Sequence, residues 1–455
     1  MSEIAVSDAP AASSAVDHRM VFSTWWPLAA SWLLMGLELP AVSAMMARLP
    51  DPTVSLAAYG GVVFPLALLI ESPIVMLLTA STALSKDWPS YRMVRRFMFL
   101  AAGSLTLLHV LIAFTPLYDL VVGRLLAPPA EVLEPARRGL RIMLPWTISI
   151  AYRRFQQGVL IRFGRSRSVG SGTAVRLGAN MLVLAVGYVL RSVPGIVVGT
   201  LAVTAGVIAE AVFAGNVVRP VLDHELPRER VTAEPLTLPW FFRFYIPLSM
   251  LPIFGFAAVP LTTAGMSRMP SAMDSLAVWP VVNGLVFTLR STGFALNEVV
   301  VSLLERPRSL PALVRFGFGL AAATTLMLVV TAASPLGRLW FGRVSALPPG
   351  LVLIASAGLW YALLLPALSA LQSLYQGVIV HSHRTRAVTE SMVIYLAVVG
   401  ATLLAGVLHA RWTALYVGLA SGTLGAGAQV AWLWWRARGT MRGLADRDLA
   451  AASAI

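Results

Sequence analysis

Two adjacent arginines, Arg153 and Arg154, stand near the middle of the segment Leu144–Arg162, which otherwise reads as a membrane helix. A guanidinium group keeps its proton in proteins. An arginine at the centre of a bilayer costs about 2.5–3.5 kcal/mol even on lenient insertion scales. These side chains must therefore face protein or water rather than lipid.

The same helix carries a polar face. Tyr152, Arg153, Gln156 and Gln157 follow Ser149 at steps of three and four residues, which places them on one side of a helix. This pattern predicts the wall of a polar cavity. Neighbouring residues on a helix point about 100° apart, so Arg153 and Arg154 cannot face one cavity equally, and the sequence leaves open which of them does.

Further polar side chains lie within apolar stretches elsewhere in the chain. We take as candidate site residues Asn283, Arg290, Asn297, Gln372 and Gln376 for binding, and Glu38 and Glu71 for coupling or charge balance. Intramembrane carboxylates are functional candidates by default. Glu38 could exchange a coupling proton or hold an arginine in place, and Glu71 reads as a partner of a central arginine. The glutamines alone could equally well bond neighbouring helices.

Counting Arg153, Arg154 and Arg290 against Glu38 and Glu71 leaves one positive charge. Arginine binds phosphate and carboxylate groups through two parallel hydrogen bonds. We therefore predict a site for a small anion, clamped by Arg153 and Arg290 from opposite sides, with a proton or sodium ion as a possible coupling ion.

The composition is that of an integral membrane protein. Of 455 residues, 57% are hydrophobic and 12% are charged, whereas soluble proteins carry about 25% charged residues. The apolar runs have the length of membrane helices rather than of barrel strands. The net charge of +14 is explained by basic cytoplasmic loops, so we predict no nucleic-acid partner.

Several kinds of chemistry find no support in the sequence. There is no cysteine, hence no thiol chemistry and no thiolate metal site. No phosphate-binding Gly-x-x-x-x-Gly-Lys motif occurs, and no cluster of Asp, Glu and His indicates a metal site or a hydrolase. We expect no enzyme activity and no cofactor.

Twelve apolar segments predict an all-α polytopic protein. They cover residues 22–47, 55–83, 92–115, 139–162, 170–191, 194–218, 239–266, 273–303, 311–334, 350–379, 387–409 and 412–435. With the N-terminus inside, inner segments hold more than twice as many arginines and lysines as outer ones. We expect an inner (plasma) membrane protein with both termini cytoplasmic. Arg141 and Arg176 also fall within spans, and Glu210 and Glu390 are interpreted as structural.

The chain repeats itself after about 220 residues. Pro27, Pro40 and Arg48 align with Pro247, Pro260 and Arg268, and after a one-residue slip Gly123-Arg124 aligns with Gly342-Arg343 and Gln157-Gly158 with Gln376-Gly377. Each copy has six spans, so both enter the membrane from the same side, as parallel repeats do. The predicted division is a disordered cytoplasmic tail (1–21), an N-terminal lobe (22–220), a cytoplasmic linker (221–238), a C-terminal lobe (239–436) and a cytoplasmic tail (437–455).

Twelve helices in two parallel halves resemble the multidrug/oligosaccharidyl-lipid/polysaccharide (MOP) exporter superfamily, which includes the MATE transporters. Within it, the sequence is most similar to the progressive ankylosis (ANK) family of transporters. The residues that carry this resemblance are Leu56–Gly60, His109–Phe114, Arg137–Gly139 leading to Pro145, Gly158–Arg162 and Tyr245–Leu248. Glu71, the Arg153-Arg154 pair and the missing long acidic C-terminal tail depart from that family.

The resemblance implies a V-shaped, two-lobed fold, alternating access and export of small anions such as pyrophosphate, nucleotides or citrate. Our prediction is a secondary active exporter of a small anionic solute with a central cavity containing arginine. Three alternatives stay open. They are a flippase for a lipid-linked phosphate, a cation-coupled multidrug exporter, and a membrane scaffold that transports nothing.

Overall fold

The computed structural model describes residues 16–230, 236–304, 306, 309–382 and 386–453, and within them every regular element is a helix. Ten helical stretches of these described residues are long and apolar enough to cross a membrane. The protein is therefore a multi-pass membrane protein, as predicted. Residues 1–15 of the predicted tail and 231–235 of the predicted linker lie outside the described residues.

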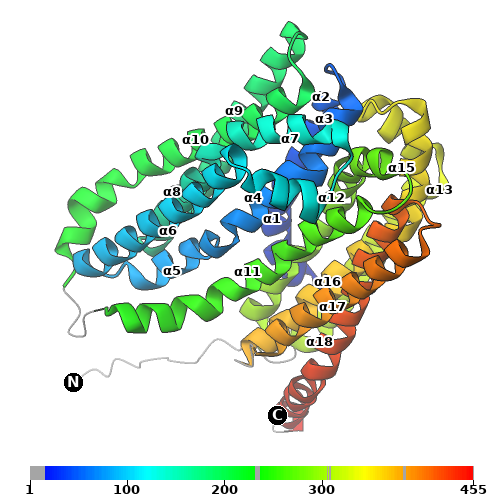
Figure 1. Cartoon of the computed structure of the whole chain (residues 1–455). Helices are drawn as coiled ribbons and strands as arrows, with labels where there is room; N and C mark the ends of the chain where they lie inside the picture. Colours follow the sequence, from blue (N-terminus) through cyan, green and yellow to red (C-terminus); the bar gives the residue numbers. More distant parts are fainter. Residues whose placement is uncertain (1–15, 231–235, 305, 307–308, 383–385, 454–455) are drawn as a thin grey trace, which may run out of the picture.

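The first half of the chain contains the helices of the first six predicted spans (Figure 1). In chain order they are α1 (His18–Gly36), α2 (Glu38–Met46), α3 (Pro52–Ala58), η1 (Tyr59–Val63), α4 (Phe64–Glu71), η2 (Ser72–Ile74), α5 (Leu77–Leu84), α6 (Trp88–Phe114), η3 (Asp119–Leu126), α7 (Ala130–Ile142), α8 (Leu144–Arg162), α9 (Arg167–Leu190) and α10 (Gly195–Val217). The short helices η4 (Val221–Glu225) and η5 (Leu226–Arg228) begin the connection to the second half.

The second half repeats this order with fewer breaks. Its helices are α11 (Leu238–Met266), α12 (Ala272–Leu303), α13 (Ser309–Ala333), α14 (Pro335–Leu339), η6 (Trp340–Val344), α15 (Pro349–Ala362), α16 (Leu365–His381), α17 (Arg386–His409) and α18 (Ala414–Ser453). The predicted fourth and twelfth spans correspond to α7–α8 and α18. Helix α18 continues well beyond the predicted end of its span, and Figure 1 shows it projecting from the bundle.

Backbone details confirm the internal repeat. Residues with positive φ recur at matching turns: Asp51 and Ser271 have φ of 54° and 56°, and Ala127 and Ala346 have φ of 49° and 54°. Both members of each pair are non-glycine residues in a left-handed conformation, which is uncommon. Each half also has a π-helical turn, η3 or η6, just before the second pair. The duplication thus extends to conformations that the sequence pattern does not specify.

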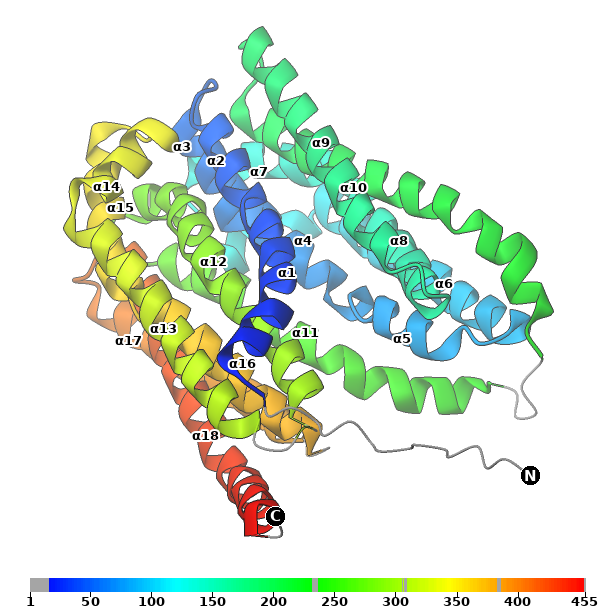
Figure 2. The same ribbon diagram turned by 180° about the vertical axis from the view of Figure 1, so that it is seen from behind.

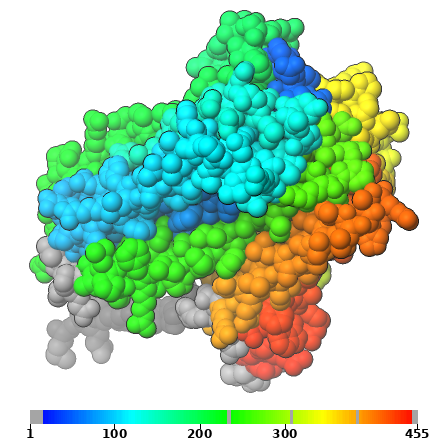
Figure 3. Space-filling model, in the orientation of Figure 1, coloured from blue at the N-terminus to red at the C-terminus, as the bar shows by residue number. Residues whose placement is uncertain are grey.

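The two halves exchange the first parts of their first helices. Helix α1 packs against α12 and α13 of the second half, where Trp25 Nε1 donates to the Thr292 carbonyl at 2.9 Å. Helix α11 packs against α4 and η2 of the first half, where the Tyr245 hydroxyl donates to the Pro73 carbonyl at 2.7 Å. Figure 2 shows α1 lying between the two groups of helices, and Figure 3 shows α11, in green, along the surface of the first half. Breaks at Leu37 and intramembrane prolines accompany these crossings.

The halves also meet through α3, η1 and α12. A side chain on Gly60 would place its Cβ about 2.5 Å from the ring of Pro280, its partner at the repeat distance of 220 residues. Only glycine permits this approach of η1 to α12. The contact therefore lies where an element of one half meets its own counterpart in the other.

Candidate functional site

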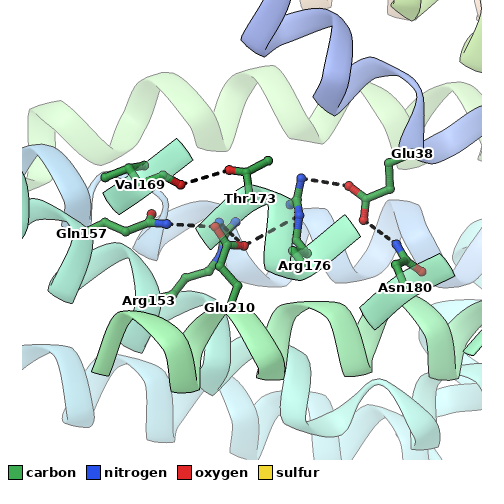
Figure 4. Close-up of polar contacts among 8 residues, drawn as sticks. All are labelled: Glu38, Arg153, Gln157, Val169, Thr173, Arg176, Asn180 and Glu210. Atoms are coloured by element: carbon green, nitrogen blue, oxygen red, sulfur yellow. Dashed lines mark hydrogen bonds and ion pairs between the residues drawn. The ribbon is translucent and has the colours of Figure 1, made fainter. Parts of the chain in front are cut away.

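Four helices of the first half place charged side chains in one buried cluster (Figure 4). We define the charged cluster as Glu38, Arg153, Gln157, Arg176, Asn180 and Glu210, contributed by α2, α8, α9 and α10. Charges away from water are stable only when they are paired and hydrogen-bonded. The cluster pairs its charges, while Arg153 Nε, Arg176 Nε and Asn180 Oδ1 have no hydrogen-bond partner within the described residues.

Glu210, on α10, is the centre of the cluster, and its side chain is fully buried. Its Oε2 accepts from Arg153 Nη1 at 2.8 Å, and its Oε1 accepts from Gln157 Nε2 at 2.9 Å. Arg176 Nε lies 3.7 Å from Oε2. One carboxylate thus contacts two arginines and an amide.

Glu38 forms the other end of the cluster, immediately after the break between α1 and α2. Its Oε2 lies 2.9 Å from Arg176 Nη2, and its Oε1 accepts from Asn180 Nδ2 at 2.8 Å. Arg176 therefore links Glu38 to Glu210. The two arginines and two glutamates of the cluster balance in formal charge.

The local sequence explains how these side chains meet. Arg153 and Gln157 are four residues apart on α8, and Arg176 and Asn180 are four residues apart on α9, so each pair projects from one helical face. Helices α8, α9 and α10 pack together, with α10 in contact with both others. Since Glu210 projects from α10, it meets both pairs.

Arg154 is separate from this cluster. Its side chain is half-buried, it makes no hydrogen bond within the described residues, and no carboxylate of these residues lies within 4 Å of it. Glu71 on α4 is buried and accepts from Trp146 Nε1 at 2.5 Å. Glu71 forms no ion pair within 4 Å with Arg153 or Arg154.

In the second half, Arg290 is the intramembrane arginine, and it lies on α12. Its Nε donates to the Ser369 hydroxyl of α16 at 2.8 Å, and its guanidinium carbon lies 5.8 Å from the ring centre of Phe294. Among the described residues no carboxylate lies within 4 Å of Arg290. No hydrogen bond or ion pair of these residues joins Arg290 to the charged cluster of the first half.

The other predicted binding residues are dispersed. Asn283 donates to the carbonyl of Trp279 on its own helix at 3.0 Å. Tyr152 lies against Gly215 of α10, and Gln156 is buried with its Oε1 unpartnered within the described residues. Asn297, Gln372 and Gln376 are half-buried on α12 and α16.

Three cluster residues were not among the predicted site residues. They are Arg176, Asn180 and Glu210. A signal for Arg176 was present, because an arginine inside a predicted span must find a partner. Glu210 was interpreted as structural from its position in the sequence, whereas it holds the arginine that we had assigned to the cavity.

Surface hollows in the described part of the chain include two on the second half. One is lined by Ile379, Ala387, Trp435 and Arg436, and the other by residues between Val330 and Arg343. Neither lining includes an intramembrane arginine of the candidate site.

No protein-family description and no curated protein sequence matches the chain. Solved structures do match it. An inward-facing structure of a multidrug resistance MATE family transporter of the MOP superfamily is 14% identical, with 92% of this chain and 99% of that chain covered and a TM-score of 0.66. An outward-facing structure of such a transporter, also 14% identical, covers 94% and 97% with a TM-score of 0.55.

A third match is the lipid II flippase MurJ in an inward closed conformation, 11% identical, with 93% and 91% covered and a TM-score of 0.68. Identities this low establish the fold. The chain has the MATE-like fold of MOP superfamily transporters over more than nine-tenths of its length, as the sequence pattern predicted.

Proposed function

We propose that the protein is a secondary active exporter of a small anionic solute of the pyrophosphate, nucleotide or carboxylate class. The two halves would alternate access to a central site from the two sides of a plasma membrane, with both termini in the cytoplasm. The MATE-like fold supports transport, since its structural neighbours are described as transporters and a flippase. The resemblance to the ANK family supports the class of solute.

The observation that carries the anionic solute is the uneven pairing of the intramembrane arginines. Arg153 and Arg176 are neutralised by Glu210 and Glu38. Arg154 and Arg290 have no carboxylate within 4 Å among the described residues. A guanidinium in a low-dielectric setting binds an anion strongly because the alternative is an unpaired charge.

We therefore assign the clamp to Arg154 and Arg290 rather than to Arg153 and Arg290. Arg153 would have to break its 2.8 Å contact with Glu210 before it could bind a substrate. Arg154 has donors free within the described residues, and Ser369 fixes the guanidinium of Arg290 through Nε while leaving both terminal nitrogens available. Two arginines from opposite halves can draw together on one anion, which couples binding to closure.

A flippase for a lipid-linked phosphate is the second candidate, because the TM-score with the lipid II flippase is 0.68. It uses the same arginine–phosphate chemistry, with a lipid tail outside the clamp. A cation-coupled multidrug exporter finds less support, since Glu38 and Glu210 are already paired with arginine.

The test is uptake of radiolabelled pyrophosphate, ATP and citrate into proteoliposomes, with a cationic dye as comparison. We expect saturable transport of at least one anion, and loss of most of it in Arg154→Gln and in Arg290→Gln. Arg343→Gln, at an exposed arginine outside the candidate site, is the matched control and should transport normally. Transport of the dye alone, wild-type rates in both variants, or no transport of any solute would contradict the proposal. Movement of a short-chain polyprenyl phosphate without transport of soluble anions would favour the flippase.

A further inference from the structure

The two halves are joined at one end of the bundle by a pair of arginines that occupy equivalent places in the internal repeat. Arg48 follows α2, and Arg268, exactly one repeat of 220 residues later, follows α11. Both lie on the turns that follow these helices. Both side chains are exposed, so they lie at the rim of the contact between the halves.

Each arginine first bonds its own helix. Arg48 Nη1 donates to the Ala44 carbonyl at 2.6 Å, and Arg268 Nη1 donates to the Ala264 carbonyl at 2.7 Å. These carbonyls lie four residues earlier, at helix C-termini where they lack intrahelical partners. The bond orients the second terminal nitrogen, Nη2, away from the parent helix.

The second terminal nitrogen of each arginine crosses to the other half. Arg48 Nη2 donates to the Arg343 carbonyl of η6 at 2.7 Å. Arg268 Nη2 donates to the carbonyls of Arg124 and Leu125 in η3, both at 2.9 Å, and its Nη1 also reaches Leu126 at 3.4 Å. Arg343 and Arg124 are themselves equivalent in the repeat, so each half supplies one arginine donor and one π-helical acceptor.

We propose that these two contacts, the arginine clasps, form a latch that holds this end of the transporter closed and sets the balance between its two access states. The inference rests on the alternating access of the proposed function. Both clasps span the same interface in opposite directions, so a rigid separation of the halves at this end breaks them together. The chain also fits the inward-facing MATE structure better than the outward-facing one, with TM-scores of 0.66 and 0.55.

The chemistry suits a latch better than a permanent joint. The acceptors are neutral carbonyls rather than carboxylates, so the arginines regain water without leaving an unpaired buried charge behind. The contact between η1 and α12 of the two halves is apolar, with Leu276 of α12 packed against Gly61 of η1. Breaking the clasps should therefore raise the fraction of molecules in which Leu276 becomes accessible.

The absence of cysteine from the sequence makes this measurable. Leu276→Cys introduces a single thiol at a position that is fully buried in this structure. Its rate of modification by a hydrophilic maleimide is measured in nanodiscs, where both sides of the membrane are open. We expect modification at least about tenfold faster in Arg48→Gln/Arg268→Gln, since four hydrogen bonds between the halves are lost.

The matched control is Arg124→Gln/Arg343→Gln. It removes the same charge from the same rim, but those side chains make no hydrogen bond within the described residues while their backbone carbonyls still accept. It should label at the unmodified rate. Arg268→Lys, which keeps the charge but loses the fork of donors, should fall between the two.

An unchanged labelling rate in Arg48→Gln/Arg268→Gln overturns the proposal. Equal acceleration in Arg124→Gln/Arg343→Gln also overturns it, because the effect would then come from the loss of positive charge at the rim. If the double variant is not monodisperse, Arg268→Gln alone decides the question, because it removes three of the four bonds. The assay needs no substrate. If labelling is accelerated but no anion is transported, the proposed solute is refuted and the latch stands. If anions are transported but labelling is unchanged, the latch is refuted and the proposed solute stands.

Discussion

The charged cluster of the first half and its equivalent positions in the second half lie on corresponding helices, but the residues of the second half are neutral. At a repeat distance of 219 residues, Arg153, Gln157, Arg176 and Glu210 correspond to Gln372, Gln376, Tyr395 and Gln429, and at 220 residues Glu38 corresponds to Ala258. Gln429 is buried and donates weakly to the Ser391 hydroxyl at 3.3 Å. The second half thus forms the same helical packing without an ion pair at these positions.

This difference indicates whether the charges of the first half contribute to folding or to transport. Buried ion pairs often stabilise no more than apolar or neutral replacements of similar size, because both charges lose their hydration. The second half demonstrates that this fold packs with neutral residues at the same places. We infer that the charges of the first half serve the transport cycle rather than assembly. Arg290 is the converse case, a charge that belongs to the second half alone.

The largest effect on stability is expected when one carboxylate of the charged cluster is neutralised while its arginine partners stay in place. Glu210→Gln leaves Arg153 and Arg176 buried with Glu38 as their only cluster carboxylate. Removing one partner of a buried pair costs about 3–5 kcal/mol. Thermal unfolding of the purified protein should show a large drop in midpoint, whereas Gln429→Ala at the equivalent position should change it far less. Equal losses at both positions would contradict the contrast.

Neutralising all four charged residues of the cluster should restore the thermal stability that Glu210→Gln alone removes. Glu38→Ala, Arg153→Gln, Arg176→Gln and Glu210→Gln together convert the first half toward the chemistry of the second. Such contacting residues are strongly non-additive. We expect the fourfold variant to unfold at a higher temperature than Glu210→Gln alone, and yet to transport poorly. A fourfold variant less stable than the single one would show that the charges are needed for folding.

An intermediate effect is expected at the unpaired arginines. Arg154→Gln and Arg290→Gln each remove a charge without leaving a carboxylate unpaired within 4 Å among the described residues. Stability should hold or rise slightly, while the apparent affinity for the anion falls by about tenfold or more, as expected for one charge-assisted contact. Initial rates over a range of anion concentrations measure this. A large loss of stability in either variant would assign that arginine to the fold.

The smallest effect is expected at Ser369, which positions Arg290 without taking part in binding. Ser369→Ala removes the 2.8 Å bond to Nε but keeps the charge. We expect a change of a few-fold in KM, in line with one hydrogen bond. Ser373→Ala, four residues further on the same helix and also buried, is the control and should leave KM unchanged.

The helix positions and the repeat could be predicted because hydrophobic runs and recurring prolines are local features of the sequence. The ion-pair partners within the charged cluster could not be predicted. Arg153 meets Glu210 across 57 residues and Arg176 meets Glu38 across more than a hundred, so their pairing depends on how α2, α8, α9 and α10 pack. The exchange of α1 and α11 between the halves could not be predicted either, because an apolar helix face does not specify which helix it packs against.

The central claim is that the net positive charge of the site lies on Arg154 and Arg290 and binds an anion. Its most direct test is the thermal shift of the purified protein with pyrophosphate, nucleotide or citrate, because a ligand that binds only the folded state raises its stability. We predict a concentration-dependent rise in Tm for at least one anion in the wild type and in Arg124→Gln/Arg343→Gln, and none in Arg154→Gln/Arg290→Gln. Stabilisation that persists in Arg154→Gln/Arg290→Gln, or that is produced by a lipophilic cation instead of an anion, would contradict the account.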